Sequence, residues 1–596
     1  MNELTEYYIL LDHADGILLM ISFVIRFLLP LLAFLVIFRC AKSLFADLPE
    51  GETWGWLEDG EGTRYPLSHF ENTVGRAGSA DVTIPDPLAA PTHAVLIRSG
   101  KGVWRLRPLR AKNAVFLNGE QIRGPVELMP GDEVTFAATD LVFRPLSEEE
   151  ERDQALNRRK PGGVWRAWLT LLLLTEFQLL TAAAHWIAAA EKLDPAIPLA
   201  FGALIAGEWF YYFFMRILRR RGFEIEILVF FLTTVGTSVI ATSVPGDLYK
   251  STLFFVAGLA AFLILGWFLR DLERIRHLRI PLAVGGLLML AVNLLIAGST
   301  NGARNWISVA GFTLQPSEFV KVCFVFAGAA TLDKLFARKN LYWFVAFSAA
   351  CVVALALMSD FGTAAVFFVA YLVIAFLRSG DVATVILSLS GAGLAGVLAV
   401  AAKPYIAGRF STWLHAWDYA SSGGYQQTRT MMAAANGGLF GLGAGSGSLY
   451  KVFAADTDMV FGMVCEELGL LVALSAVAAF AIMAAFVIRS ARTARSSFYV
   501  IGASGALAVL LFQIALNVLG AFDILPFTGV TFPFLSKGGS SLLSCWCLMA
   551  FIKAADTRQN ASFTVKLPAS YRRAVRTREL EDYIDEQMKK GGSTHA

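Results

Sequence analysis

A long apolar segment occupies residues 16–38, which read GILLMISFVIRFLLPLLAFLVIF. As a helix rising 1.5 Å per residue it would reach about 34 Å, enough to cross the hydrocarbon core of a bilayer. No basic stretch precedes it and no small-residue cleavage site follows it, so we interpret it as a retained membrane anchor rather than a cleaved signal. A first transmembrane span is therefore predicted here.

Apolar segments of this kind recur along most of the 596 residues. Charged residues make up 17% of the chain, against about 25% in a typical soluble domain. The net charge of +3 comes without the long basic run of a nucleic-acid-binding protein. The composition therefore excludes a soluble protein and a nucleic-acid partner, and it predicts a polytopic α-helical membrane protein. Twelve further spans are predicted near 164–189, 196–218, 224–244, 252–270, 280–298, 315–333, 341–358, 360–377, 382–402, 458–488, 497–519 and 530–553.

Basic residues predict how these spans are oriented, because short basic connections stay on the cytoplasmic side. Alternate connections are rich in Arg and Lys, as at 216–221, 270–279 and 489–495. With thirteen spans, the amino terminus is predicted outside, and residues 41–163 and the carboxyl-terminal tail inside. The outer connections are predicted near 299–314, 359–360, 403–457 and 520–529.

A water-soluble segment interrupts the apolar pattern between residues 52 and 146. From residue 64 on, short β-type runs alternate with turn signals, which is typical of an all-β sandwich. The sequence Leu117-Asn118-Gly119-Glu120 predicts a hairpin, and Pro130-Gly131-Asp132 predicts a tight turn.

Four separate motifs lie in this segment, VGRAGSADVTIPD (74–86), THAVL (92–96), KNAVFLNG (112–119) and LMPGDEVTF (128–136). In these motifs the segment resembles the forkhead-associated (FHA) family. The resemblance implies a loop surface that binds phosphothreonine through Arg76, His93 and Asn113, although Ala90 stands where the family has a serine. Two interpretations stay open, a phosphopeptide reader and a degenerate domain used for other protein contacts.

Within the apolar part, polar residues and glycines cluster in four stretches at the predicted outer ends of helices, 301–321, 359–364, 423–469 and 524–541. Ionisable groups in apolar segments are costly and therefore mark candidate functional sites. Their clustering at one membrane face predicts a single outward-facing site.

Five groups of motifs lie in these stretches, namely QPSEFVK (315–321), D-x-G-T (360–363), GYQ and GGLFG (424–441), TD and EELG (457–469), and LPFTGVTFPFLSKGGSS (525–541). In these motifs the chain resembles the SEDS family (shape, elongation, division and sporulation; the RodA and FtsW group) over about 222–555. The resemblance implies a ten-helix core that polymerises lipid II, an undecaprenyl-pyrophosphate-linked disaccharide-peptide, into peptidoglycan on the outer face. It also implies a class B penicillin-binding protein transpeptidase as partner.

Transfer of a sugar from a lipid pyrophosphate needs a group that takes the proton of the acceptor hydroxyl, and cationic help for the leaving pyrophosphate. Asp458 matches the family's catalytic aspartate. We interpret it as a general base or as the ligand of a divalent cation, Mg²⁺ or Mn²⁺, with a helix-start cap as the plainer alternative. No dedicated metal site is predicted. The candidate substrate-binding residues are Arg304, Trp306, Gln315, Glu318, Lys321, Asp360, Tyr425, Gln426, Arg429, Lys451, Thr457, Ser536, Lys537 and Ser540.

Other ionisable residues of the apolar part also have structural interpretations. Glu318 and Lys321 stand three apart on one helix, so an internal ion pair is predicted. Glu466 and Glu467 are too far along and around their helix to pair with Asp458, and they are interpreted as buried network residues.

Several positions depart from the family pattern. Lys537 stands where the family often has Tyr, and Arg429 replaces a common Gln. Residues 452–456 (VFAAD) replace the familiar Leu-Pro-Glu-Ala-His, whereas Thr457 and Asp458 are intact.

Two rival functions are a lipid II flippase and a non-catalytic scaffold for cell-wall synthesis. Transporters often carry broken helices at the membrane midplane, whereas the polar motifs here gather at one face, which favours an enzyme of the bacterial cell membrane. The predicted layout is an anchor (1–45), a cytoplasmic FHA domain (52–146), a charged linker (147–163), two additional transmembrane helices (164–220), the SEDS core (222–555) and a cytoplasmic tail (556–596).

Overall fold

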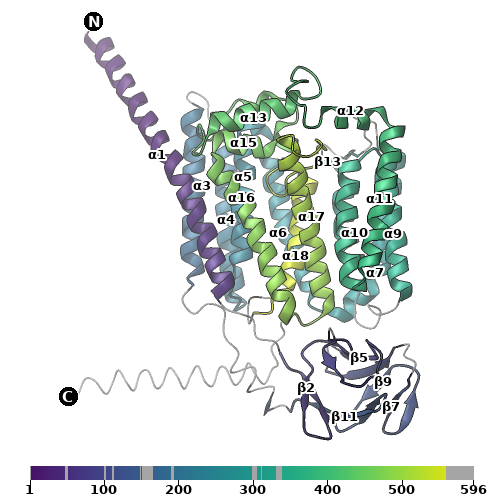
Figure 1. Cartoon of the computed structure of the whole chain (residues 1–596). Coiled ribbons are helices and arrows are strands. Elements are labelled where there is room, and N and C mark those ends of the chain that lie inside the picture. The colour runs from purple at the N-terminus through teal and green to yellow at the C-terminus, as the bar shows by residue number, and fades with distance from the viewer. Residues whose placement is uncertain are drawn as a thin grey trace, which may run out of the picture.

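The chain forms a helical bundle with a β-sandwich beyond one end of it (Figure 1). The predicted linker 147–163 lies largely outside the residues that the structure describes, as does most of the predicted tail 556–596. The structure is a computed structural model that describes residues 2–46, 52–78, 80–99, 102–109, 113–147, 149–150, 153, 165–189, 194–297, 305–309, 312–329, 338–558 and 561.

Each of the thirteen predicted spans contains a helix, and ten candidate membrane spans in the described residues are long and apolar enough to cross a bilayer. The chain is therefore a multi-pass membrane protein. The helices are α1 (Asn2–Ala46), α3 (Ala167–Ala188), α4 (Ala196–Ile217), α5 (Glu224–Ser243), α6 (Leu248–Leu269), α7 (Leu272–Ile296), α8 (Pro316–Gly328), α9 (Arg338–Leu357), α10 (Phe361–Ser379), α11 (Val382–Ala402), α16 (Leu470–Ser490), α17 (Ser497–Ala521) and α18 (Gly539–Ala554).

The predicted extents of two spans are wrong. The segment 458–488 is broken at Gly469, whose φ of +88° is open to glycine but strained for other residues. A Cβ there would also lie 2.4 Å from the carbonyl oxygen of Leu439. In the segment 530–553 the helix begins only at Gly539, because Pro533 and Gly538 interrupt the apolar run before it.

Short elements fill the end of the bundle away from the sandwich (Figure 1). They lie in the connections between the apolar spans, and residues from them line the candidate site. They are η1 (Pro245–Asp247), β12 (Ile307–Val309), β13 (Phe312–Leu314), α12 (Pro404–Thr412), α13 (Tyr425–Gly437), η3 (Leu449–Lys451), α14 (Ala455–Asp458) and α15 (Val460–Glu467).

Helix α5 forms the centre of the bundle, with nearly every residue from Glu224 to Ala241 buried. The additional helices α3 and α4 attach to it through a buried polar contact. Gln178 Nε2 lies 3.0 Å from Glu208 Oε2 and 3.0 Å from Thr234 Oγ1. Because few other partners exist for polar groups in lipid, such a contact fixes the packing of the three helices.

The β-domain is an all-β sandwich, as predicted. Asn118 and Gly119 adopt φ angles of 49° and 83°, which fit the predicted two-residue hairpin. The six-stranded sheet has the order β2-β1-β11-β10-β7-β8 and the five-stranded sheet β4-β3-β5-β6-β9. The strands are β1 (Gly55–Asp59), β2 (Arg64–Pro66), β3 (Glu71–Gly75), β4 (Val82–Thr83), β5 (Ala94–Arg98), β6 (Trp104–Pro108), β7 (Val115–Leu117), β8 (Glu120–Ile122), β9 (Val126–Leu128), β10 (Glu133–Phe136) and β11 (Thr139–Pro145).

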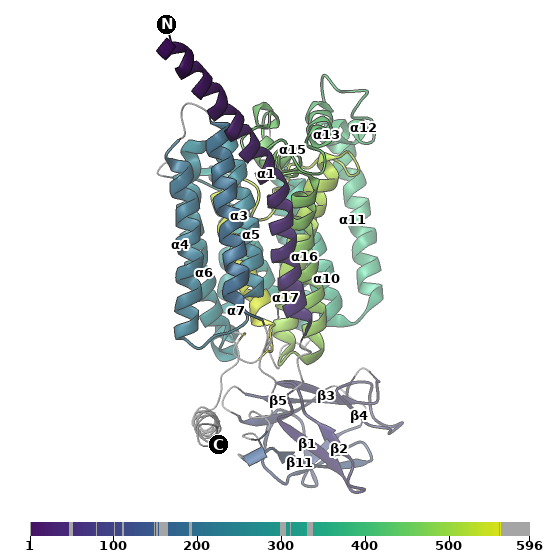
Figure 2. The ribbon, with the colours of Figure 1, turned by 90° about the vertical axis from the view of Figure 1, so that its left-hand side faces the viewer.

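The sandwich contacts the connection between α16 and α17, with β3 and β5 nearest the bundle (Figure 2). Buried Glu71 accepts hydrogen bonds from Ser496 Oγ (2.9 Å) and from the backbone N–H of Ser497 (3.1 Å), at the start of α17. Arg495 forms an ion pair with Glu52, and its guanidinium lies over the ring of Trp54. A carboxylate at a helix N-terminus is favourable because it meets the positive end of the helix dipole.

Candidate active site

Asp458 ends α14, a single turn that precedes α15. The side chain does not cap a helix, since the N-cap position of α15 is Met459. Partial burial raises the pKa of the Asp458 carboxyl to about 6, although the Thr457 hydroxyl and the Arg409 guanidinium act in the opposite direction. A carboxylate with such a pKa can take up a proton near neutral pH.

The turn that carries Asp458 is held in place by hydrogen bonds that other residues donate to its backbone carbonyl groups. Asn517 of α17 donates from its side-chain amide to the carbonyl oxygens of Asp458 (3.1 Å), Thr457 (3.4 Å) and Val530 (2.8 Å). Ser536 Oγ donates to the carbonyl oxygen of Thr457 at 2.6 Å. The backbone N–H of Lys537 donates to the carbonyl oxygen of Asp456 at 2.8 Å.

Asp458 lines a cavity of about 430 Å³, here named the Asp458 cavity. The predicted outer connections all contribute to it, so the expected convergence at one end of the bundle is confirmed. Arg409, which also lines it, donates to the carbonyl oxygen of Phe527 at 2.8 Å. The predicted substrate-binding residues in its wall are Asp360, Tyr425 and Gln426.

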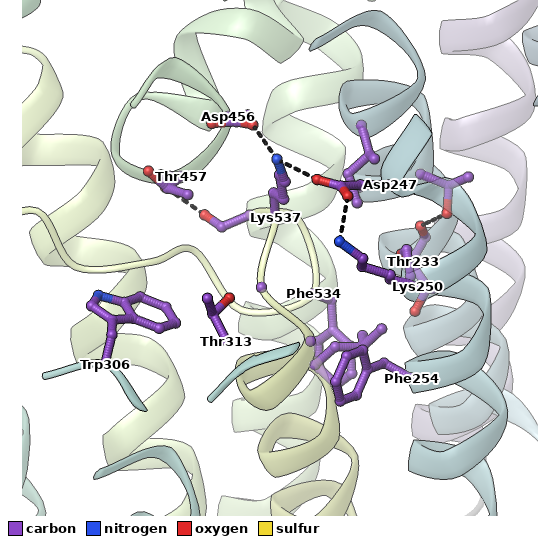
Figure 3. Close-up of a pocket in the computed structure, with 18 residues that line it drawn as sticks. Thr233, Asp247, Lys250, Phe254, Trp306, Thr313, Asp456, Thr457, Phe534 and Lys537 are labelled. Atoms are coloured by element: carbon purple, nitrogen blue, oxygen red, sulfur yellow. Dashed lines mark hydrogen bonds and ion pairs between the residues drawn. The ribbon is translucent and has the colours of Figure 1, made fainter. Parts of the chain in front are cut away.

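A second cavity of about 440 Å³, here named the Lys537 cavity, is lined by Asp456 and Thr457, the two residues that precede Asp458 (Figure 3). Its wall includes the predicted residues Trp306, Thr457, Ser536 and Lys537. Phe254 and Phe534 line its apolar part, and the charged groups Asp247, Lys250 and Asp456 lie beside Lys537.

The remaining predicted residues line neither cavity. Gln315, Glu318, Lys321 and Ser540 belong to a buried polar network between α8, α10 and α18, in which the predicted Glu318–Lys321 ion pair is confirmed at 2.7 Å. Arg429 and Lys451 are exposed, and each lies over the ring of a neighbouring tyrosine. Arg304 lies outside the described residues.

Glu466 and Glu467 hold the glycine-rich loop that follows α13, as buried network residues. Glu466 accepts hydrogen bonds from the backbone N–H groups of Ser448 and Leu449. Glu467 accepts from the N–H of Gly445 and from Thr242 Oγ1. This confirms the interpretation that they do not pair with Asp458.

Some residues of the site were not predicted from the sequence. Asp247 and Lys250 stand three apart in a short outer connection, and that charge pattern was the available signal. Asn517 is an asparagine buried in an apolar helix, which is itself a signal of a specific partner. Asn305, in the wall of the Asp458 cavity, carried no such signal.

The phosphopeptide residues of the sandwich are only partly available. Arg76 is exposed, and Asn113 donates to the carbonyl oxygen of Leu88 at 2.7 Å. His93 is fully buried, and its Nδ1 accepts a hydrogen bond from the N–H of Ala90 at 3.0 Å. The predicted contact of His93 with a peptide is therefore corrected, because this buried side chain supports the loop at Ala90 from inside the domain.

Comparison with known proteins identifies the family to which the helical bundle belongs. Residues 224–561, more than half of the chain, match the family described as cell cycle protein, which covers FtsW, RodA and SpoVE. The chain belongs to this family. Residues 72–137 match the FHA domain, so this FtsW/RodA/SpoVE family member carries an FHA domain before its membrane core.

Several members of the FtsW/RodA/SpoVE family resemble the chain along most of their own length. The peptidoglycan glycosyltransferase RodA of Mycobacterium tuberculosis is 30% identical over 322 residues, which cover 51% of this chain and 69% of RodA. The probable peptidoglycan glycosyltransferase FtsW of Saccharophagus degradans is 31% identical, over 57% of this chain and 94% of FtsW. The crystal structure of Thermus thermophilus RodA is 24% identical, with a TM-score of 0.41, over 55% of this chain and 94% of that chain.

The role of Asn517 can be measured with a matched pair of variants. Asn517→Ala should lower the initial rate of glycosyl transfer about tenfold or more, because loss of these hydrogen bonds would move the Asp458 carboxylate in the wall of its cavity. Gln513→Ala is the control, since Gln513 is a buried amide one turn earlier on α17 and its side chain has no hydrogen-bond partner among the described residues. Equal losses in the two variants, measured as initial rates at matched protein levels, would contradict a specific role for Asn517.

Proposed function

We propose that this chain is a peptidoglycan glycosyltransferase that polymerises lipid II at the outer face of a bacterial cell membrane. The observation that carries the proposal is Asp458, with its pKa raised to about 6, in the wall of a cavity at one end of a membrane-spanning bundle. The membership of the FtsW/RodA/SpoVE family and the names of the relatives support the same activity.

In the proposed reaction Asp458 acts as the general base. The acceptor hydroxyl attacks the anomeric carbon of the donor sugar, the bond from that carbon to the pyrophosphate oxygen breaks, and the hydroxyl proton passes to the Asp458 carboxylate. The lipid pyrophosphate leaves as an anion. Arg409, which lines the same cavity, supplies positive charge where negative charge develops.

A divalent cation, Mg²⁺ or Mn²⁺, is a further proposal for this cavity. The carboxylates available to it are Asp360 and Asp458, and among the described residues no group of three or more His, Cys, Asp or Glu side chains forms a site for it. Mg²⁺ is commonly held by one or two carboxylates together with substrate phosphates. Such an ion would therefore enter with the pyrophosphate and neutralise its charge.

The FHA domain and the Asp458 cavity are proposed to lie on opposite sides of the membrane. They occupy opposite ends of the bundle (Figure 1). The FHA domain meets the α16–α17 connection, which holds the basic residues Arg489, Arg492 and Arg495. Because basic connections remain cytoplasmic, the FHA domain and the tail are assigned to the cytoplasm and the cavity to the outside.

The FHA domain is proposed to regulate the enzyme through protein contacts, with a phosphothreonine protein as the ligand of its loops. The strand register supports this assignment. Glu71 pairs with Ile97 at the end of β3 and β5 that contacts the bundle, whereas Val74 pairs with Ala94 at the other end. Arg76 follows β3 at that other end, so the phosphopeptide loops lie away from the contact with the bundle.

A class B penicillin-binding protein transpeptidase is the proposed partner, on the strength of the family resemblance. The rival proposal of a lipid II flippase is less well supported, because the Asp458 cavity lies among the loops at one end of the bundle rather than at its midplane.

The catalytic proposal is tested with purified chain, labelled lipid II and Mg²⁺, with and without a matched transpeptidase. Wild-type chain should produce glycan polymer, and Asp458→Asn should produce less than about one hundredth of it, because the amide accepts no proton. The initial rate should rise with pH through about 6 and level off above it, since only the deprotonated carboxylate is active. Polymer that persists undiminished in Asp458→Asn would disprove the assignment. Removal of Mg²⁺ with a chelator tests whether the reaction requires a divalent cation.

The orientation is tested with a protease added to right-side-out membrane vesicles. The connection 403–457 should be cut, whereas the FHA domain should be protected until the vesicles are opened. Cleavage of the FHA domain in closed vesicles would reverse the orientation.

Phosphopeptide binding is tested on the full chain with a phosphothreonine peptide and its unphosphorylated twin. The phosphorylated peptide should bind about tenfold or more tightly, and Arg76→Ala should abolish the difference because the bidentate phosphate contact is lost. Arg144→Ala is the control, since its side chain is 60% exposed near the opposite end of the sandwich. If wild-type chain does not discriminate between the two peptides, the domain is not a phosphothreonine reader.

A further inference from the structure

Four charged side chains form a continuous row at the mouth of the Lys537 cavity (Figure 3). Lys250 Nζ lies 3.0 Å from Asp247 Oδ1, and the other oxygen of Asp247 lies 2.8 Å from Lys537 Nζ. Lys537 Nζ also lies 3.6 Å from Asp456 Oδ2. The row thus runs from the start of α6 to the turn that carries Asp458.

Lys537 and Asp456 belong to two different connections of the chain, and they are in contact in two ways. Their side chains form the ion pair, and the backbone N–H of Lys537 donates to the carbonyl oxygen of Asp456 at 2.8 Å.

Lys537 lies between the carboxylates of Asp247 and Asp456 and pairs with both. Without its ammonium group Asp247 would keep Lys250 as a partner, whereas Asp456 would lose its ion pair with Lys537. Lys537 and Asp456 are about 30% and 17% exposed, so their interaction is only partly screened by water. Loss of this contact would release Asp456, which lies two residues before Asp458.

We propose that Lys537 is a positioning residue, which ties the Asp456–Asp458 turn to Asp247 by an ionic bridge, and that Lys537 and Asp456 act as a matched pair. This proposal rests on the proposed function, since the turn matters only if Asp458 is catalytic. It adds a role for three residues outside the reacting centre. The charge of Lys537 acts on Asp458 through the backbone of the turn.

The proposal predicts a particular pattern of kinetic changes in the polymerisation assay. Lys537→Met should lower kcat about tenfold to a hundredfold while KM changes less than about twofold, because the catalytic group is displaced and the cavity walls remain. Lys537→Arg should retain most of the activity. Lys537→Tyr alone should behave like Lys537→Met, whereas Lys537→Tyr combined with Asp456→His should recover activity to within about threefold of wild type.

Lys403→Met provides the matched control, because it removes an exposed ammonium group elsewhere at the same end of the bundle. An unchanged kcat in Lys537→Met, or a rise confined to KM, would overturn the proposal. So would a double variant no more active than Lys537→Tyr.

A measurement that needs no polymer separates this proposal from the proposed function. The unfolding temperatures of wild type, Lys537→Met, Asp456→Asn and the double variant form a double-mutant cycle. The effects of the two substitutions should be clearly non-additive, because each removes the same ionic contact. If the two effects are additive, the ionic bridge is overturned, even when the wild-type enzyme makes polymer. If the two effects are non-additive but wild-type chain makes no polymer, the bridge stands and only the glycosyltransferase function is contradicted.

Discussion

The side-chain amide of Asn517 joins two segments of backbone, the turn at Thr457 and Asp458 and the loop at Val530. Their carbonyl oxygens lie where helices end or break, next to a bundle that offers little water. An unpaired carbonyl there would cost free energy, so the amide of α17 stabilises the turn, together with the hydroxyl of Ser536, which donates to the carbonyl oxygen of Thr457. The turn that carries Asp458 is thereby tied to a regular helix.

Helix α17 also connects the two ends of the molecule. It begins at the contact between Glu71 and Ser496 and runs about 30 Å from Ser497 to Asn517. The end of the bundle next to the sandwich is fixed by buried charges that are paired. Arg558 contacts Glu224 and Asp556, and Lys553 contacts Glu226. Breaking one such pair would leave an uncompensated buried charge, so these contacts specify how α5 and α18 meet.

At the opposite end of the bundle, charges are arranged differently. They line the two cavities and remain partly exposed. Both cavities contain positions that depart from the motifs of the family resemblance, Val452 and Phe453 in the Asp458 cavity and Asp456 and Lys537 in the Lys537 cavity.

The spans and the sandwich could be predicted from the sequence, because each is encoded locally, whereas Asp458 was singled out only through the resemblance of the motifs around it to those of a known family. The transfer of 20 or so apolar residues into lipid, the alternation of short strands and a turn such as Asn118-Gly119 depend on neighbours along the chain. The break at Gly469 was not predicted, although Glu466 and Glu467 interrupt the apolar run just before it. The contacts of Gln315 with Asp360 and Ser540 were not predicted either, because they join residues from separate parts of the chain. The meeting of Lys537 with Asp247 and Asp456, and of Asn517 with the Asp458 turn, was decided only by tertiary packing. Contacts between residues so far apart in the chain depend on how the helices pack against one another, and interactions between sequence neighbours do not determine that packing.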